Sequence, residues 1–478
     1  MAVLEKLEPQ SVFYYFEELC SIPHGSFHTK KVSDWLVGFA KSHHLEYIQD
    51  ESNNVIIFKA AATGYETAEP VIMQGHMDMV CEKAADCTKN METEGLDLMI
   101  DGDIIRARGT TLGGDDGIAV AMMLAVLAAE NLPHPALECV FTVDEEVGML
   151  GAMSIDLSRL KGRRMINMDT EEEGTLTVSC AGGNVTRCLL PIRREAFSGT
   201  GYSVTITGLV GGHSGVEIDK GRANANVLMG RLLTTMHEAT DMRLVSVCGG
   251  QKDNAITREC VAEFVATDAQ IVKRVCDEMG AALRNEYAVT DKDVSIQWKA
   301  CTTAMPLTAE STNRVLCLLT CAPNGIQSMS ADIEGLVQTS LNMGILITTD
   351  TTVEASFGVR SSVATQLTML VQRLRCLTEA LGGTVEVSGS YPGWQYRQDS
   401  PLRDLVVGVF TEQYGHAPAI EAIHAGLECG LLSEKLPGLD CVAFGPDMRE
   451  VHTCRENMSV SSVQRIYKMV VEVLKRMH

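Results

Sequence analysis

The residues most able to do chemistry follow short apolar segments of the sequence. They are His76 and Asp78 after residues 71–74, Glu145 and Glu146 after residues 137–143, Asp169 after residues 164–168, and His452 after residues 442–451. If these segments are parallel strands, their carboxyl ends meet at one edge of a sheet. Carboxylates gathered there would repel one another unless cations lay between them. Mixed histidine and carboxylate ligands suit zinc, with cobalt or manganese as substitutes.

A glycine-containing segment adds a further carboxylate. Residues 110–117 read TTLGGDDG, and Asp115 stands at the end of this loop, where it could bridge two ions. Taken singly, each motif has an ordinary structural reading. An Asp-Asp-Gly segment is usually a turn or a helix N-cap, a His-x-Asp segment a loop histidine, and an Asp-Glu-Glu segment solvated surface. Their joint occurrence at predicted strand ends favours a metal site.

The segments between these residues alternate between helix and strand patterns. Residues 117–130 are apolar nearly all round, which predicts a buried helix. Strands are predicted on its C-terminal side at residues 137–143 and 164–168, and amphipathic helices are predicted earlier, at residues 9–20 and 29–43. Such alternation is typical of an α/β fold with a mostly parallel sheet flanked by helices.

The pattern changes near residue 193. Residues 202–209 alternate apolar and polar with period two, which indicates a sheet with one wet face. The segments that follow predict an antiparallel sheet with helices on one face, and the buried pattern returns near residue 400. The simplest arrangement is a catalytic α/β domain, residues 1–192 and 389–478, interrupted by an inserted α+β domain, residues 193–388.

Composition narrows the classes of function. The formal net charge is −22, with no basic stripe, so binding to nucleic acid is not expected. No run of eighteen apolar residues and no secretory signal is present, which predicts a cytoplasmic protein without a membrane span. The sixteen cysteines are scattered singly, as expected of reduced thiols, and a metal site built on Cys81 and Cys87 is disfavoured.

Five segments form a combination characteristic of one family. They read GHMDMV, TLGGDDG, DEEVGMLGA, NMDTEEEG and GGHSG. Together they resemble the di-zinc metallopeptidases that include carboxypeptidase G, aminoacylase and bacterial di- and tripeptidases. Within this family, TLGGDDGIAVAMML, GGHSGVEIDKGRANAN and IHAGLECGLL are similar to the aminoacyl-histidine (Xaa-His) dipeptidases. The resemblance implies a di-zinc aminopeptidase-like catalytic domain with an inserted lid that also forms a homodimer.

The resemblance also implies a ligand set for two zinc ions. His76 and Asp169 would hold one ion, Glu146 and His452 would hold the other, and Asp115 would bridge both, often across a cis peptide bond to the next residue.

The same resemblance implies the catalytic roles. Glu145 would be the general base that takes a proton from the attacking water and passes it to the leaving amine. Asp78 would hydrogen-bond His76 and fix its tautomer. His213, within GGHSG, would donate to the tetrahedral oxyanion, in cis through lid closure or from the partner subunit. Without the resemblance, a glycine-rich turn with a surface histidine is the simpler reading of that segment.

A dipeptidase must also bind both free termini of its substrate. Arg360 and Asn254 resemble substrate-binding positions of the family, and arginine is the natural clamp for a carboxylate. His424 and Glu428 follow a predicted strand of the catalytic domain. A carboxylate at Glu428 could bind the free amine, or it could cap or pair within its own helix; both readings stay open.

The predicted function is thus metal-dependent hydrolysis of dipeptides, with Xaa-His substrates and broad specificity. A related tripeptidase or N-acyl amino acid deacylase would keep the same zinc ligands, so only the pocket distinguishes them. A catalytically inactive, peptide-binding relative is the third hypothesis, and the complete set of ligands together with Glu145 argues against it.

Overall fold

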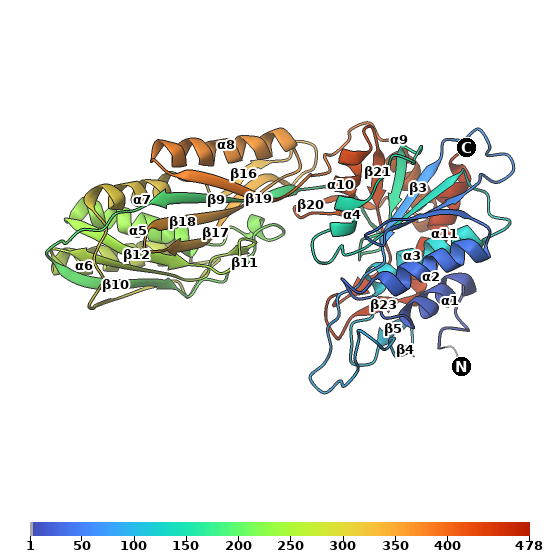
Figure 1. The fold of residues 1–478 in the computed structure, drawn as a ribbon, viewed down its shortest axis with the longest axis horizontal. Coiled ribbons are helices and arrows are strands. Elements are labelled where there is room, and N and C mark those ends of the chain that lie inside the picture. The colour runs from blue at the N-terminus through green and yellow to red at the C-terminus, as the bar shows by residue number, and fades with distance from the viewer. Residues whose placement is uncertain (1–2) are drawn as a thin grey trace. The chain divides into compact units, whose positions relative to one another are not determined.

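The computed structural model describes residues 3–478, which form two compact units (Figure 1). Unit 1 comprises residues 3–179, 396–422 and 427–478, and unit 2 comprises residues 180–395 and 423–426. The first boundary falls earlier than residue 192 because strand β9 (Gly182–Pro191), predicted with the first domain, pairs with two strands of unit 2.

Unit 1 is built on an eight-stranded sheet. Its strands, in spatial order, are β1 (Glu46–Gln49), β2 (Val55–Lys59), β6 (Leu137–Thr142), β3 (Val71–His76), β7 (Arg164–Asn167), β21 (Asp440–Ala443), β8 (Thr175–Cys180) and β20 (Ala419–Ile423). The four central strands β6, β3, β7 and β21 run parallel, as predicted. Strands β1 and β2, which the sequence did not predict, pair antiparallel with each other and with β6, and β8 joins β21 antiparallel. The sheet is therefore parallel only in its middle.

Helices cover this sheet. They are α1 (Gln10–Cys20), α2 (Lys30–Ser42), α3 (Gly114–Ala128), α4 (Leu150–Ser154), α9 (Pro401–Tyr414), α10 (Glu428–Lys435) and α11 (Val460–Arg476). Helix α3 packs against β3, α1 and α11, so it is surrounded by protein. This position explains why nearly every residue of α3 is apolar, as the sequence predicted. A second, four-stranded sheet pairs β22 (Met448–Arg449), β23 (Asn457–Ser459), β5 (Ile104–Ala107) and β4 (Leu98–Asp101).

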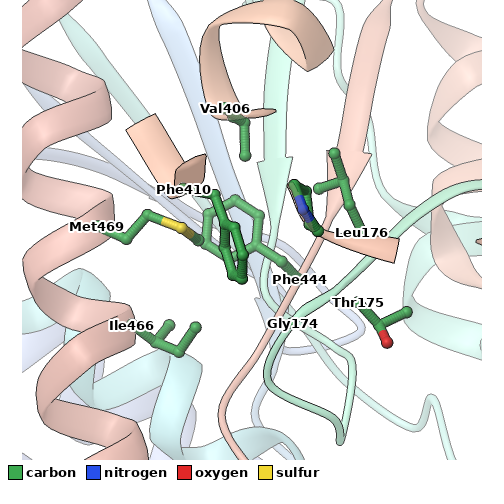
Figure 2. Close-up of a pocket in the computed structure, with 9 residues that line it drawn as sticks. Gly174, Thr175, Leu176, Val406, Phe410, Phe444, Ile466 and Met469 are labelled. Atoms are coloured by element: carbon green, nitrogen blue, oxygen red, sulfur yellow. The ribbon is translucent and has the colours of Figure 1, made fainter. Parts of the chain in front are cut away.

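An apolar cluster fixes α9 and α11 to the sheet. Figure 2 shows Phe410 of α9 facing Phe444, with Ile466 and Met469 approaching from α11. All four side chains are buried, and Phe410 is only 3% exposed. Apolar packing therefore helps to hold the C-terminal segments that return to unit 1.

This packing leads to a stability prediction. We expect Phe410→Ala to lower the free energy of unfolding by about 3–5 kcal/mol, because it removes a buried ring and leaves a cavity. The neighbouring exposed residue provides the control, since Thr411→Ala should change the same quantity by less than about 0.5 kcal/mol. Urea unfolding followed by circular dichroism measures both; equal effects of the two substitutions would contradict the packing.

Unit 2 is built on a nine-stranded antiparallel sheet. Its strands, in spatial order, are β15 (Ser295–Ala300), β10 (Thr200–Thr207), β14 (Cys260–Ala266), β12 (Met242–Gly249), β17 (Val337–Thr348), β18 (Thr352–Ser361), β9 and β19 (Thr384–Tyr391), with β16 (Gly325–Met329) on β17. The helices α5 (Ala225–Ala239), α6 (Ala269–Glu286), α7 (Ala309–Cys321) and α8 (Ala364–Ala380) pack on one face of this sheet (Figure 1). The α+β pattern predicted for this part of the chain is thus present.

Two further predictions can be compared with the fold. All sixteen cysteines are free thiols. Within residues 3–478, none of the helices combines the length and the apolar character needed to cross a bilayer.

Candidate metal centre

His76, Asp115 and Asp169 meet at the carboxyl end of the parallel strands. His76 is the last residue of β3, and Asp169 lies two residues beyond β7. His76 Nε2 lies 3.1 Å from Asp115 Oδ1 and 3.9 Å from Asp169 Oδ1. The side chain of His76 is buried, so its ring is held in place.

Glu146 and His452 lie on the other side of Asp115. His452 Nε2 is 3.0 Å from Glu146 Oε2 and 3.2 Å from Asp115 Oδ2. The two oxygens of Asp115 therefore face different histidines, which is the arrangement that a bridging carboxylate needs. His452 does not directly follow a core strand as predicted: β21 ends at Ala443, and His452 occupies the turn between β22 and β23 with φ of 62°.

The donor set fits divalent metal ions. Two groups offer ligand atoms within 4.8 Å of one another: His76, Asp115 and Glu146, and His76, Asp116 and Asp169. Among the described residues, the buried oxygens Glu146 Oε1 and Asp116 Oδ1 have no hydrogen-bond partner. Leaving a buried carboxylate oxygen without a partner is costly, and a cation would satisfy such oxygens.

The pKa values of the residues in the centre also indicate a site for cations. Burial, together with the charges of Glu428, Glu146 and Asp115, raises the pKa of Glu145 to about 8, although the His76 charge opposes this shift. Hydrogen bonds to Asp115 and Glu146 raise the pKa of His452 to about 11. The raised pKa values of Glu145 and His452 reflect the excess negative charge of the neighbouring carboxylates. Metal cations bound in the centre would neutralise the same charge.

Glu145 and Asp78 are linked to the centre by hydrogen bonds. The backbone N–H of Glu145 donates to Asp78 Oδ1 over 3.1 Å, and Ser26 Oγ donates to Asp78 Oδ2 over 2.8 Å. His76 Nδ1 lies 3.1 Å from the backbone oxygen of Asp78 and 3.4 Å from its carboxylate. Either acceptor leaves Nε2 of His76 free to face a metal ion.

The loop that carries Asp115 is held by a residue that sequence reasoning missed. The carboxylate of Glu456 accepts backbone N–H groups from Leu112, Gly113 and Gly114, over 2.8, 3.2 and 2.8 Å. Gly113 has φ of 66°, a conformation that favours glycine, and the Asp115–Asp116 peptide bond is cis. No motif surrounds Glu456, so only its contacts reveal this role.

We expect Glu456→Ala to weaken metal binding about tenfold to a hundredfold, because three backbone donors would lose their acceptor and the loop would shift. Glu456→Gln keeps one acceptor oxygen and should have a smaller effect. Titration of metal-free protein with zinc measures the affinity of each variant. Wild-type affinity in Glu456→Ala would show that the loop is positioned by other contacts.

Glu428 lies in a buried polar network below the strand ends. Its Oε2 accepts from Gln74 Nε2 over 2.5 Å and from Thr142 Oγ1 over 2.6 Å, and Asn167 donates in turn to Gln74. The carboxylate therefore pairs with the sheet rather than within α10, and burial raises its pKa to about 7. Oε1 has no partner in the described part of the chain, so a ligand could reach Glu428 only through that oxygen.

Unit 2 carries the other predicted residues. His213 belongs to the short strand β11 (Gly212–His213), which pairs with β13 (Ala255–Ile256). Nδ1 of His213 accepts the N–H groups of Gly215 and Val216, each over 3.2 Å. Burial and the charge of Arg360 lower the pKa of His213. The neutral ring therefore carries its proton on Nε2 and can donate.

His424 and Arg360 lie near His213 within unit 2. His424 Nε2 is 2.7 Å from Ser340 Oγ, and burial with the charges of Arg360 and His213 lowers its pKa to about 4. Arg360 donates to the hydroxyl of Tyr391 over 2.9 Å. Asn254 is exposed, and its backbone oxygen accepts from Ser214. A guanidinium beside two neutral histidines can bind a carboxylate.

The sequence and the fold of this chain are similar to those of known peptidases. The profile of Peptidase family M20/M25/M40 matches residues 72–476. The chain is 37% identical to the cytosol non-specific dipeptidase of Escherichia coli K12 over 480 residues, which cover 99% of each protein. The crystal structure of aminoacylhistidine dipeptidase from Vibrio alginolyticus superposes with a TM-score of 0.94 at 34% identity, covering 99% of this chain and 97% of that one.

More distant structures share the fold. Aminopeptidase PepT from Bacillus cereus matches with a TM-score of 0.57 at 15% identity, covering 98% of this chain and 99% of that one. At this level of identity the likeness concerns the fold alone.

Proposed function

Because the chain belongs to peptidase family M20/M25/M40, we propose that it hydrolyses the peptide bond of dipeptides, Xaa-His dipeptides among them, at a centre of two zinc ions. The observation that carries this proposal is the pair of histidines on opposite oxygens of Asp115, 3.1 and 3.2 Å away. The names of the E. coli and Vibrio relatives support the substrate class, and the first of them supports a cytoplasmic location.

In the proposed site, His76 and Asp169 would hold one zinc ion, Glu146 and His452 would hold the other, and Asp115 would contact both. Zinc ions bound there would polarise the scissile carbonyl group and lower the pKa of water towards neutrality. Cobalt or manganese could replace zinc, since the same nitrogen and oxygen ligands accept them.

Glu145 is the proposed general base. It directly precedes the proposed ligand Glu146, and a carboxylate at that position could take a proton from the attacking water. The same proton can then pass to the leaving amine. The hydrogen bond between the Glu145 backbone and Asp78 fixes the position of the base beside His76.

His213 is the proposed oxyanion donor. Its Nε2–H is available because Nδ1 already accepts two backbone N–H groups. A donor directed at the tetrahedral oxygen contributes most where water is excluded.

Arg360 is the proposed clamp for the substrate's carboxylate, with Asn254 and His424 as neighbouring contacts. The guanidinium of Arg360 donates a hydrogen bond to the hydroxyl of Tyr391, which fixes its orientation. We also propose a homodimer formed through unit 2, which would allow His213 to act across the dimer. Sedimentation tests this separately, because a monomer would leave His213 to act in cis.

A substrate panel tests the function. Zinc-loaded protein should cleave Ala-His and Gly-Leu faster than a tripeptide such as Ala-Gly-His and faster than an N-acetyl amino acid. Preference for the tripeptide would identify a tripeptidase, and preference for the acetylated amino acid would identify a deacylase. Stoichiometric binding of Ala-His by zinc-loaded protein without cleavage would identify a peptide-binding protein.

A further inference from the structure

Glu171 is an acidic residue beside the metal centre that the proposed mechanism does not use. It follows the ligand Asp169 by two residues, and the residue as a whole is exposed. Within residues 3–478, its carboxylate forms no hydrogen bond or ion pair, whereas the nearby Glu173 is bound by Arg465 over 2.6 Å. The carboxylate of Glu171 is therefore unpaired within the described residues and accessible to solvent.

The backbone around Glu171 is fixed. Met448 N–H donates to the backbone oxygen of Glu171 over 2.9 Å, and Glu173 N–H donates to Asp447 Oδ1 over 2.9 Å. Gly445 approaches this segment so closely that a Cβ atom there would lie 1.9 Å from the backbone oxygen of Thr170. A side chain on such a segment can bind a ligand with little loss of backbone entropy.

Glu171 lies between the two sides of the centre, because Asp169 precedes it by two residues and its backbone oxygen is bound by Met448, the first residue of the β22–β23 hairpin that carries His452. The side chains whose charges act on it are Asp115, His452, Glu146 and Glu456. No lysine or arginine belongs to this group. Of these acids, Asp115 and Glu146 are proposed metal ligands and Glu456 accepts three backbone N–H groups, which leaves the carboxylate of Glu171 to attract a cationic group of the substrate.

A dipeptide carries a cationic group, its free α-ammonium, close to the bond that is cleaved. The α-ammonium nitrogen is joined to the scissile carbonyl carbon through a single Cα atom, so the two atoms are only about 2.5 Å apart. Whatever binds the ammonium must therefore lie beside the metal ligands. Glu428 is also near, but its side chain is fully buried and its Oε2 is already bound by Gln74 and Thr142.

We infer that Glu171 binds the free α-ammonium group of the substrate and so selects peptides with an unblocked N-terminus. This inference rests on the proposed dipeptidase function and deepens it, because it assigns the residue that distinguishes a dipeptide from an N-acyl amino acid. Binding of the ammonium would also align the scissile carbonyl with Glu145.

The test compares Ala-His with propionyl-His, which lacks only the amine. We expect Glu171→Gln to lower kcat/KM for Ala-His about tenfold to a hundredfold, the range of a charge-assisted hydrogen bond, and to leave propionyl-His within about twofold. Glu172→Gln, which removes the charge of the next exposed residue, is the matched control and should change neither substrate. Metal content per chain should stay the same in both variants.

Glu428→Gln completes the comparison. If this variant loses the preference for Ala-His and Glu171→Gln keeps it, Glu428 binds the amine and our inference is wrong. An equal fall for both substrates in Glu171→Gln would also overturn it, since that result indicates a structural role.

Measuring the binding of Ala-His and propionyl-His tests the role of Glu171 independently of whether the protein hydrolyses dipeptides. Calorimetry on the Glu145→Gln background measures the affinity for both compounds without turnover. Loss of the preference for Ala-His on adding Glu171→Gln supports the inference even if the wild-type protein cleaves neither compound. An unchanged preference contradicts it, whatever the rate of hydrolysis.

Discussion

Replacing Glu145 with glutamine should lower kcat for dipeptide hydrolysis about a hundredfold to ten-thousandfold while two metal ions remain bound per chain. Glutamine keeps the shape of the side chain but cannot take a proton from water. None of the close ligand contacts of the centre involves Glu145, so the substitution should spare metal binding. Steady-state kinetics and metal analysis on the same sample measure both quantities.

A second variant makes this prediction specific. Glu145→Asp keeps a carboxylate on a shorter side chain and should recover part of the lost activity. Near wild-type activity in Glu145→Gln would show that another group moves the proton. Loss of metal in the same variant would instead place Glu145 among the ligands.

Removing the carboxylate of Asp115 should have the second large effect. We expect Asp115→Ala to hold fewer than two metal ions per chain and to lose at least about a thousandfold in kcat/KM, because its oxygens lie between both histidines. Glu172→Ala removes a nearby exposed acid and should leave metal content and activity unchanged. Two tightly bound ions in Asp115→Ala would contradict the bridging role.

Much of the centre could be predicted because its residues stand next to strong local patterns. His76 ends β3 and Asp169 lies two residues beyond β7, both strands contain apolar residues that made them recognisable, and parallel strands bring such positions together. The buried helix α3 was equally evident, since apolar residues on all sides leave few alternatives. The resemblance to a known family then supplied the individual roles.

The remaining contacts depend on residues far apart in the chain. Glu456 binds the loop at Leu112 across 344 residues, and Glu428 reaches Gln74 across 354 residues. No local pattern marks either residue, because the acceptor role comes from tertiary packing. Strand β9 was missed for a related reason: it begins with two glycines and an asparagine, which are poor strand formers, and its partners lie much later in the sequence.

His452 shows the limit of the strand-end argument. The sequence placed it directly after an apolar strand, whereas β21 ends at Ala443 and the next short strand, β22, spans only two residues. A two-residue strand carries no periodicity from which it could be recognised. The histidine still reaches Asp115 because the β22–β23 turn projects it there.

The most direct test of the account is the metal content of the wild-type protein together with its rate of Ala-His hydrolysis, before and after chelation. We expect about two metal ions per chain, rapid cleavage that is lost when the chelator removes them, and recovery with zinc, cobalt or manganese. Protein that binds no metal after reloading, or that cleaves Ala-His equally well after chelation, would contradict the two-metal centre.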